Sequence, residues 1–293
     1  IPQKATLMKK FLSFPFLAVA AIVLAAAGFG SCSKSGGPLA TDSISLSLNS
    51  DTLAIANIKI DYPSDGGKTL LDSARAYICN VLATHFIDVD ENGKPYKSGI
   101  TFDGDKEDGK AVAEFYGKEF QKEISGMRKA DTMLPSTIGY IHDVAIQKVC
   151  DAETFVTFLT TDYCFLGGAH GSETVSGASL SKDGGHLIAY PVDTTKTAEL
   201  QPLFRKGLSG YFSKQDKNIN EKNLTDFLFI EHDTIPMPST SPYFMPNGIV
   251  FVYQQYEIAP YAAGQPTFTV SYKDIAPYLT KEAFAVAEPF LKK

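Results

Sequence analysis

Alternation of hydrophobic and polar residues recurs in separate stretches of the chain and predicts β-strands, whose successive side chains point to opposite faces. Ile44, Leu46 and Leu48, for example, alternate with serine. A β-branched and aromatic run at 154–165 and the turn signals between other short runs predict further strands. The predicted strands together span residues 44–48, 53–62, 138–146, 154–165, 173–180, 186–190, 243–245, 249–253 and 267–272. Lys182-Asp183-Gly184-Gly185 and Asn247-Gly248 are predicted hairpin turns, because Asp, Asn and Gly tolerate the positive φ of such turns.

A second spacing, of three to four residues between apolar positions, predicts helices. Residues 68–86 carry one such stripe and residues 112–127 carry another, so both are predicted to be long helices with one buried face. A shorter amphipathic helix is predicted over 199–212, and a final helical turn over 274–279. The first half is therefore predicted to hold the long helices, and the second half to be rich in hairpins.

These elements predict an α+β fold with antiparallel sheets. Residues 33–42 have the Ser/Gly/Lys composition of a flexible spacer, and two α+β modules are predicted at 43–165 and 166–293. The chain has 293 residues, of which 44% are hydrophobic, as is usual for a globular protein. Its formal net charge of -6 argues against a nucleic-acid partner, because no Lys/Arg-rich stripe is available to neutralise phosphates.

The start of the chain predicts its location. Two lysines follow Met8, an apolar run spans 11–29, and Gly30-Ser31-Cys32 then offers small residues and a cysteine. Residues 1–32 thus resemble a bacterial lipoprotein signal peptide, with 1–7 as an upstream artefact and Cys32 as the lipidated residue. The alternative is an uncleaved anchor, since a run of about 19 apolar residues can just span a bilayer. Either reading places the domain in the cell envelope, facing the periplasm or the outside, with the membrane as a partner through Cys32.

With Cys32 lipidated, three cysteines remain. Cys79 lies on the apolar side of a predicted helix and reads as a small buried hydrophobe. Three cysteines allow at most one disulfide, and Cys150 and Cys164, near the outer ends of two adjacent predicted strands, are the two that could meet. No C-x-x-C is present, so zinc and redox motifs are unsupported.

Two stretches partly resemble a calcium-binding loop. Asp88 to Gly93 fits the first half of the pattern, but Gly99 stands where the closing Glu is needed. Asp103 to Glu114 fits the ligand spacing, but Asp108 replaces the glycine of the sharp turn. Acidic turns produce such half-matches often, so we expect neither a metal nor a cofactor.

Two further stretches hold the candidate binding residues. Gly167, Gly168, His170 and Gly171 follow a predicted strand, so the stretch is either a tight bend or a surface where something approaches the main chain. His170 itself is either a hydrogen-bonded structural residue or a ligand or base.

The second stretch carries Tyr256, Glu257, Pro260 and Tyr261. Pro260 rigidifies the loop, and the two tyrosines offer flat amphipathic surface at low entropic cost. Glu257, set among apolar neighbours, either caps backbone donors or pairs with a base, or has a raised pKa and serves as an acid or base.

Taken together, the Gly-Gly-Ala-His-Gly bend and the Tyr-Glu-Ile-Ala-Pro-Tyr-Ala-x-Gly loop resemble the extracytoplasmic domain of RsiV-type anti-sigma factors. They also resemble the segment that precedes the catalytic domain of a PdaC-type peptidoglycan deacetylase. The resemblance covers residues 43–284, with 43–165 similar to the PdaC-type domain and 166–293 to the RsiV C-terminal domain. It implies an envelope-exposed α+β receptor domain, which in the anti-sigma factors binds lysozyme. We expect neither sigma-factor signalling nor deacetylation, since the sequence shows no cytoplasmic sigma-binding segment and no deacetylase domain.

Three functional hypotheses follow. The first is a binding module for a lysozyme-like wall-active protein or for cell-wall glycan, with the site formed by Gly167, Gly168, His170, Gly171, Tyr256, Glu257, Pro260 and Tyr261. The second is an envelope glycan or ester hydrolase in which His170 and Glu257 act as base and acid; no nucleophile elbow or conventional carboxylate pair supports it. The third is a structural envelope protein whose two stretches are only strand connectors.

Overall fold

A five-stranded sheet organises the first half of the protein in the computed structural model. The structure describes residues 37–49, 53–85, 87–89, 95–97, 100–135, 137–231 and 233–292. The predicted signal peptide with Cys32, and the calcium-like stretch 88–93 apart from a short strand, lie outside these residues. No helix in the described part of the chain has the length and apolarity to cross a membrane.

The strands of this sheet run in the order β1-β2-β5-β6-β7. They span β1 (Ala40–Asn49), β2 (Ala54–Asp65), β5 (Tyr140–Asp151), β6 (Phe155–Phe165) and β7 (Ser172–Ser181). Neighbouring strands are antiparallel except β2 and β5, which are parallel and therefore need a crossover connection. A small separate pair, β3 (Ile87–Val89) and β4 (Pro95–Lys97), lies within that connection.

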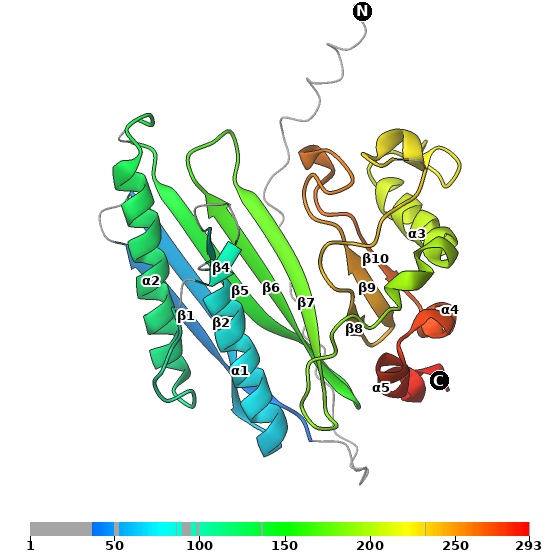
Figure 1. The fold of residues 1–293 in the computed structure, drawn as a ribbon, viewed down its shortest axis with the longest axis horizontal. Helices are drawn as coiled ribbons and strands as arrows, with labels where there is room; N and C mark the ends of the chain where they lie inside the picture. Colours follow the sequence, from blue (N-terminus) through cyan, green and yellow to red (C-terminus); the bar gives the residue numbers. More distant parts are fainter. Residues whose placement is uncertain are drawn as a thin grey trace, which may run out of the picture. The chain divides into compact units, whose positions relative to one another are not determined.

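Two helices of the crossover, α1 (Lys68–Thr84) and α2 (Gly109–Ala130), cover one face of the sheet (Figure 1). Their apolar stripes are buried as the sequence predicts, with Ile78 and Phe120 fully enclosed, except at Met127, which is 44% exposed near the end of α2. Asp108 caps the N-terminus of α2, because its side chain accepts hydrogen bonds from the backbone N–H of Lys110 and Ala111. The aspartate that breaks the calcium-loop pattern is therefore a helix cap.

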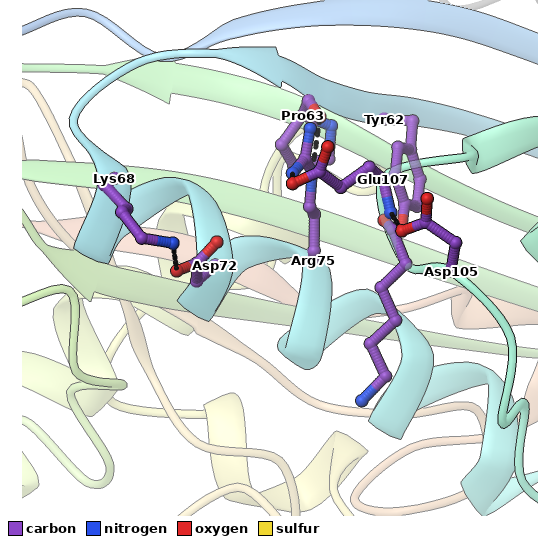
Figure 2. A network of polar contacts seen from close by, with 8 residues as sticks. Tyr62, Pro63, Lys68, Asp72, Arg75, Asp105 and Glu107 are labelled. Atoms are coloured by element: carbon purple, nitrogen blue, oxygen red, sulfur yellow. Dashed lines mark hydrogen bonds and ion pairs between the residues drawn. The ribbon is translucent and has the colours of Figure 1, made fainter.

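The rest of that acidic stretch is tied down in the same way (Figure 2). Asp105 accepts a hydrogen bond from the backbone N–H of Glu107 (2.8 Å), and Glu107 pairs with the buried Arg75 of α1 (3.7 Å). Tyr62 at the end of β2 donates to the carbonyl of Lys106 (2.6 Å). These carboxylates therefore serve in a turn, an ion pair and a cap, and they do not converge on one point.

The second half is built on a three-stranded sheet in the order β10-β9-β8, formed by β10 (Thr267–Val270), β9 (Gly248–Val252) and β8 (Tyr243–Met245). α3 (Thr197–Phe212) packs on it, and Phe204, Phe251 and Phe268 form an aromatic cluster between them. The chain closes with α4 (Tyr272–Ile275), a 3₁₀ turn at Ala276–Tyr278, and α5 (Lys281–Leu291). The α+β fold with mostly antiparallel sheets is thus confirmed.

Three local predictions need correction. Residues 186–190 are not a strand: the only pairing left is a single bridge from Leu180 to Leu187, because the chain then leaves β7 and buries Ile188 in the second core. The hairpin turn is Pro246-Asn247, and Gly248 is already the first residue of β9. β1 begins at Ala40, so the last three residues of the predicted spacer belong to the sheet.

The two halves are joined across the predicted module boundary, because the boundary after residue 165 lies at the end of β6 and so separates β6 from its paired neighbour β7. Buried hydrogen bonds also join the first sheet to β8 of the second. The hydroxyl of Thr157 on β6 donates to the carbonyl of Phe244 on β8 (2.8 Å), and the N–H of Phe244 donates to the hydroxyl of Ser179 on β7 (3.0 Å). Residues 35–293 form one compact unit that contains every hydrophobic cluster found in the described residues. This segment therefore holds the interactions that stabilise its own fold.

The strand register also excludes the disulfide that the sequence allowed. Cys150 lies opposite Thr157 and Cys164 lies opposite His142, so the two cysteines are at opposite ends of the β5–β6 pair. Seven residues of extended strand separate them by about 23 Å, far beyond the reach of a disulfide. Both thiols are free.

Because burial raises the pKa of Cys150 to about 11 and that of Cys164 to about 12, both thiols stay protonated at pH 8. We expect iodoacetamide to label the folded segment 35–293 at least about 100-fold more slowly than the same segment in guanidinium chloride, since only the thiolate reacts. Mass spectrometry of quenched samples gives both rates. Rapid labelling of Cys164 in the folded protein would contradict this expectation.

Candidate binding site

The two stretches singled out in the sequence lie in contact, although nearly ninety residues separate them in the chain. The connection from β6 to β7 brings His170 against the loop that follows β9. The imidazole of His170 stacks on the ring of Tyr261, with centroids 3.7 Å apart and planes inclined by 21°. The hydroxyl of Tyr256 lies 3.3 Å from Nε2 of the same imidazole. We call His170, Tyr256 and Tyr261 the aromatic shelf.

Backbone contacts hold the histidine in place. Nδ1 of His170 donates to the carbonyl of Gly171 (2.9 Å), and the hydroxyl of Tyr261 donates to that same carbonyl (3.1 Å). A carbonyl can only accept, so Nδ1 carries the proton and Nε2 faces Tyr256. Gly167 makes the turn after β6 with φ of +79°, and a Cβ there would lie 2.0 Å from a methyl of Leu134. The glycine-rich stretch is therefore a tight bend, and this bend presents an exposed histidine.

Tyr256 is held in an unusual backbone conformation. Its φ is +65°, a left-handed value that a residue with a bulky side chain rarely adopts, yet its side chain is 56% exposed. Pro260, also exposed, then leads into a short 3₁₀ turn at Tyr261–Ala263, whose first hydrogen bond runs from Ala263 N–H to the Pro260 carbonyl (2.8 Å). Residues with strained backbones cluster at functional sites, so Tyr256 is a candidate binding residue.

Three glutamines fix the loop to the sheet. β7 is the edge strand, and unpaired backbone groups on an edge need partners. The side-chain amide of Gln254 supplies an acceptor and a donor to this edge: it accepts from the N–H of Val175 (2.9 Å) and donates to the carbonyl of the same residue (2.8 Å). Gln255 accepts from the N–H of Glu173 (3.1 Å), and Gln265 donates to the carbonyl of Glu173 (3.0 Å). The amides thus replace a neighbouring strand and set the position of the shelf.

Glu257 faces away from this shelf. One carboxylate oxygen accepts from the N–H of Ser239 and the other from the N–H of Gln254, both at 2.6 Å. The contacts of His170 are instead with Gly171, Tyr256 and Tyr261. The carboxylate is thus occupied by backbone donors, and the arrangement gives no support to an acid–base pair of His170 and Glu257. Gly168 is exposed in the bend, whereas Gly171 is buried beneath it.

A second group of chemical interest was missed from the sequence. His85, directly after α1, and His142 on β5 both contact the carboxylate of Asp162 on β6, at 2.7 and 2.9 Å. Burial acts to raise the pKa of Asp162, but the bonds to His142 and His85 outweigh it and hold that pKa well below the usual range. Within the described residues this is the one group of three His, Cys, Asp or Glu side chains placed closely enough to hold a metal ion.

Some signal for this group exists in the sequence. His142 lies in the predicted strand 138–146, but His85 and Asp162 were not considered with it. The β5–β6 register sets Asp162 opposite Val144, which makes it a diagonal neighbour of His142 on the same face. A correct pairing of the two predicted strands would have brought these two residues together.

Comparison with known proteins identifies a domain without a known activity. Residues 193–273 match a family model described as "Protein of unknown function (DUF3298)", so the chain carries a DUF3298 domain there. The match includes the loop of Tyr256 and Tyr261 and leaves out the bend of His170. A search among curated proteins gave no match.

Two crystal structures share the fold. One is a DUF3298 family member from Bacteroides fragilis NCTC 9343, with a TM-score of 0.62 and 20% identity, covering 89% of this chain and 100% of its own. The other is a DUF3298 family protein from Pseudomonas aeruginosa PAO1, with a TM-score of 0.54 and 13% identity, covering 85% of this chain and 97% of its own. The similarity therefore extends over both halves of the fold, well beyond the segment that matches the family model.

Proposed function

We propose that this protein is a lipid-anchored module of the cell envelope that binds a lysozyme-like wall-active protein through the aromatic shelf. The observation that carries the proposal is the pre-ordered stack of the exposed His170 on the half-buried Tyr261, beside the strained and exposed Tyr256. Glycan of the cell wall is the alternative ligand, and the experiment below separates the two.

The shelf has the properties of a recognition surface. Tyrosine supplies a large contact area with few rotatable bonds, so little entropy is lost when it binds. Here that loss is smaller still, because hydrogen bonds to Gly171 and the glutamine contacts to β7 already fix both loops. A rigid aromatic surface next to a polar rim is the usual composition of an energetic centre in a protein interface.

The choice of a wall-active partner rests on resemblance. The bend at 167–171 and the loop at 256–264 are the two stretches that resemble the lysozyme-binding domain of RsiV-type anti-sigma factors. The lipoprotein-like pattern ending at Cys32 would hold such a domain at the membrane surface, where wall-degrading enzymes and their glycan substrate are present.

Calorimetric titration of segment 35–293 with lysozyme, and separately with muropeptides, tests the proposal. We expect saturable binding of lysozyme that Tyr256→Ala weakens by about 30-fold, the effect typical of truncating a central aromatic residue. Tyr190→Ala is a matched control, since Tyr190 is 59% exposed and also has a positive φ (49°). The two substitutions have similar backbone consequences, so only the loss of a contact distinguishes them.

Two results would count against the proposal. No binding heat with lysozyme and none with muropeptides would show that the shelf binds neither a lysozyme-like protein nor cell-wall glycan. Equal weakening by Tyr256→Ala and Tyr190→Ala would place the site elsewhere. Binding of muropeptides but not of lysozyme would retain the shelf and assign glycan as its ligand.

A further inference from the structure

The face of the first sheet that α1 and α2 cover holds three side chains that are commonly metal ligands. His85 directly follows α1, His142 lies on β5 and Asp162 lies on β6. Their nearest ligand atoms all lie within 4.8 Å of one another. We propose that His85, His142 and Asp162 form a zinc site with one coordination position open to solvent or to a substrate atom.

The distances within the cluster are those of hydrogen bonds, shorter than the distances between ligands of a zinc ion. Nδ1 of His85 lies 2.7 Å from one oxygen of Asp162, and Nε2 of His142 lies 2.9 Å from the other. A tetrahedral zinc ion with bonds of about 2.0–2.1 Å separates its ligand atoms by about 3.3 Å. The two nitrogen–oxygen pairs therefore need to open by roughly half an ångström, which rotation of the Asp162 carboxylate can provide.

The surroundings keep the three side chains in position. The ring of Phe120 on α2 packs against both imidazoles, with centroids 5.6 Å from His85 and 4.7 Å from His142. His142 is buried, whereas the side chain of Asp162 is 25% exposed and gives the cluster its access to solvent. Phe120 and the burial of His142 therefore restrict the cluster, while Asp162 leaves it partly accessible.

The ligand atoms of this cluster favour zinc over calcium, the ion that the acidic stretches suggested. Calcium and magnesium prefer sets made only of oxygen ligands, whereas two imidazoles and a carboxylate suit zinc and its neighbours in the first transition series. Three protein ligands also leave one position of a tetrahedral ion free, as in sites where zinc polarises a water or a carbonyl.

His85 offers the cleanest test of the site. Its Nε2 is buried without a hydrogen-bond partner, so replacing the ring removes little polar interaction beyond the contact with Asp162. His186 is a suitable control because it also pairs with a carboxylate, that of Glu282 at 2.6 Å, on an exposed surface outside the cluster.

Segment 35–293, free of any histidine tag and stripped of metal with a chelator, is titrated with zinc chloride in a calorimeter. We expect one zinc ion per chain, and a loss of at least about 100-fold in affinity for His85→Gln and Asp162→Asn. His186→Gln is expected to bind zinc as the unchanged protein does, and calcium chloride is expected to give no saturable heat. Circular dichroism confirms that each variant is folded.

A second measurement needs no variant. Cobalt bound in place of zinc is expected to show the strong visible absorption of a four- or five-coordinate ion, and added zinc is expected to remove it. Failure to bind zinc would overturn the proposal, as would an affinity unchanged by His85→Gln or a cobalt spectrum of the free six-coordinate ion. In each of those cases the cluster is a hydrogen-bonded link between α1 and the sheet.

Discussion

Replacing Arg128 by methionine is expected to lower the free energy of unfolding by about 3–5 kcal/mol, although the new side chain is of similar length. Arg128 lies in the last turn of α2 and is only 7% exposed. Its guanidinium donates to three backbone carbonyls in the connection to β5, those of Ile138 (2.6 Å), Pro135 (2.8 Å) and Asp131 (3.1 Å). Methionine fills the space but leaves all three carbonyls without this donor.

The expected loss in the free energy of unfolding follows from the three carbonyls that lose their donor. A hydrogen bond to a charged group contributes about 1.5–3 kcal/mol, and partial exposure of the loop carbonyls reduces the sum of three. The guanidinium also lies 5.8 Å from the centre of the Tyr140 ring, a cation–π contact that methionine cannot make. We expect the loop to loosen at the point where the crossover enters β5.

Urea unfolding of segment 35–293 measures this change. Arg205→Met is the control: Arg205 is more exposed, and its ion pair and hydrogen bond within the described residues are with Asp233, whose side chain is itself 67% exposed, so the expected loss is below about 1 kcal/mol. Arg128→Lys is expected to fall between the two, since one ammonium cannot reach all three carbonyls. A loss below 1 kcal/mol for Arg128→Met would show that water replaces the guanidinium at little cost.

Local pattern was sufficient for most of the first sheet and its helices. The period of two in β5 and the helical stripe of α2 each identify the face that is buried, because burial of one face is what creates the pattern. Prediction failed at 186–190, where a short apolar run follows a turn but Ile188 is buried in the second core instead of pairing along β7. α5 was not predicted at all. Pro289 lies inside it, although Thr280 caps its first turn by accepting from the N–H of Ala283.

The residues of the shelf were predicted from the sequence, but their contact with one another was not. Both of its loops carry unusual combinations of glycine, proline and aromatic residues, and these identified His170, Tyr256 and Tyr261. Their contact could not be predicted, because it depends on the glutamine side chains that pair with the edge of β7. A glutamine that replaces a strand has no characteristic neighbours in the sequence. Cys150 and Cys164 were misjudged for a related reason, since adjacency of two strands does not define which of their ends meet.

One strand connects the two candidate sites. Asp162 and Tyr163 are consecutive residues of β6, so their side chains point to opposite faces of the sheet. Asp162 contacts both histidines on the helix-covered face, while the ring of Tyr163 lies against the backbone of Gly171, which accepts the hydrogen bonds of the shelf. A change in the position of this end of β6 would therefore reach both sites, and binding measurements with and without zinc would detect it.

The largest effect from a single added methyl group is expected at Gly248. This glycine begins β9 with φ of +149°, and a Cβ there would lie 2.0 Å from the carbonyl oxygen of Val270 in β10. That oxygen belongs to the backbone of a paired strand, so it cannot move without breaking the β9–β10 register, in which Val270 lies opposite Ile249. Gly248→Ala is therefore expected to cost about 4 kcal/mol or more, from backbone strain and lost pairing together.

The same glycine-to-alanine substitution is expected to have the opposite effect on stability at Gly126. This glycine is exposed in the last third of α2, and a Cβ there would meet no atom within 4 Å. Gly126→Ala is expected to stabilise the protein by about 0.5–1 kcal/mol, because alanine loses less backbone entropy in a helix. Chemical unfolding of both variants gives the two signs in one experiment. A small loss at Gly248 would mean that β10 can shift away from β9, and β9 would then be too weakly held to fix the loop of Tyr256 and Tyr261 that follows it.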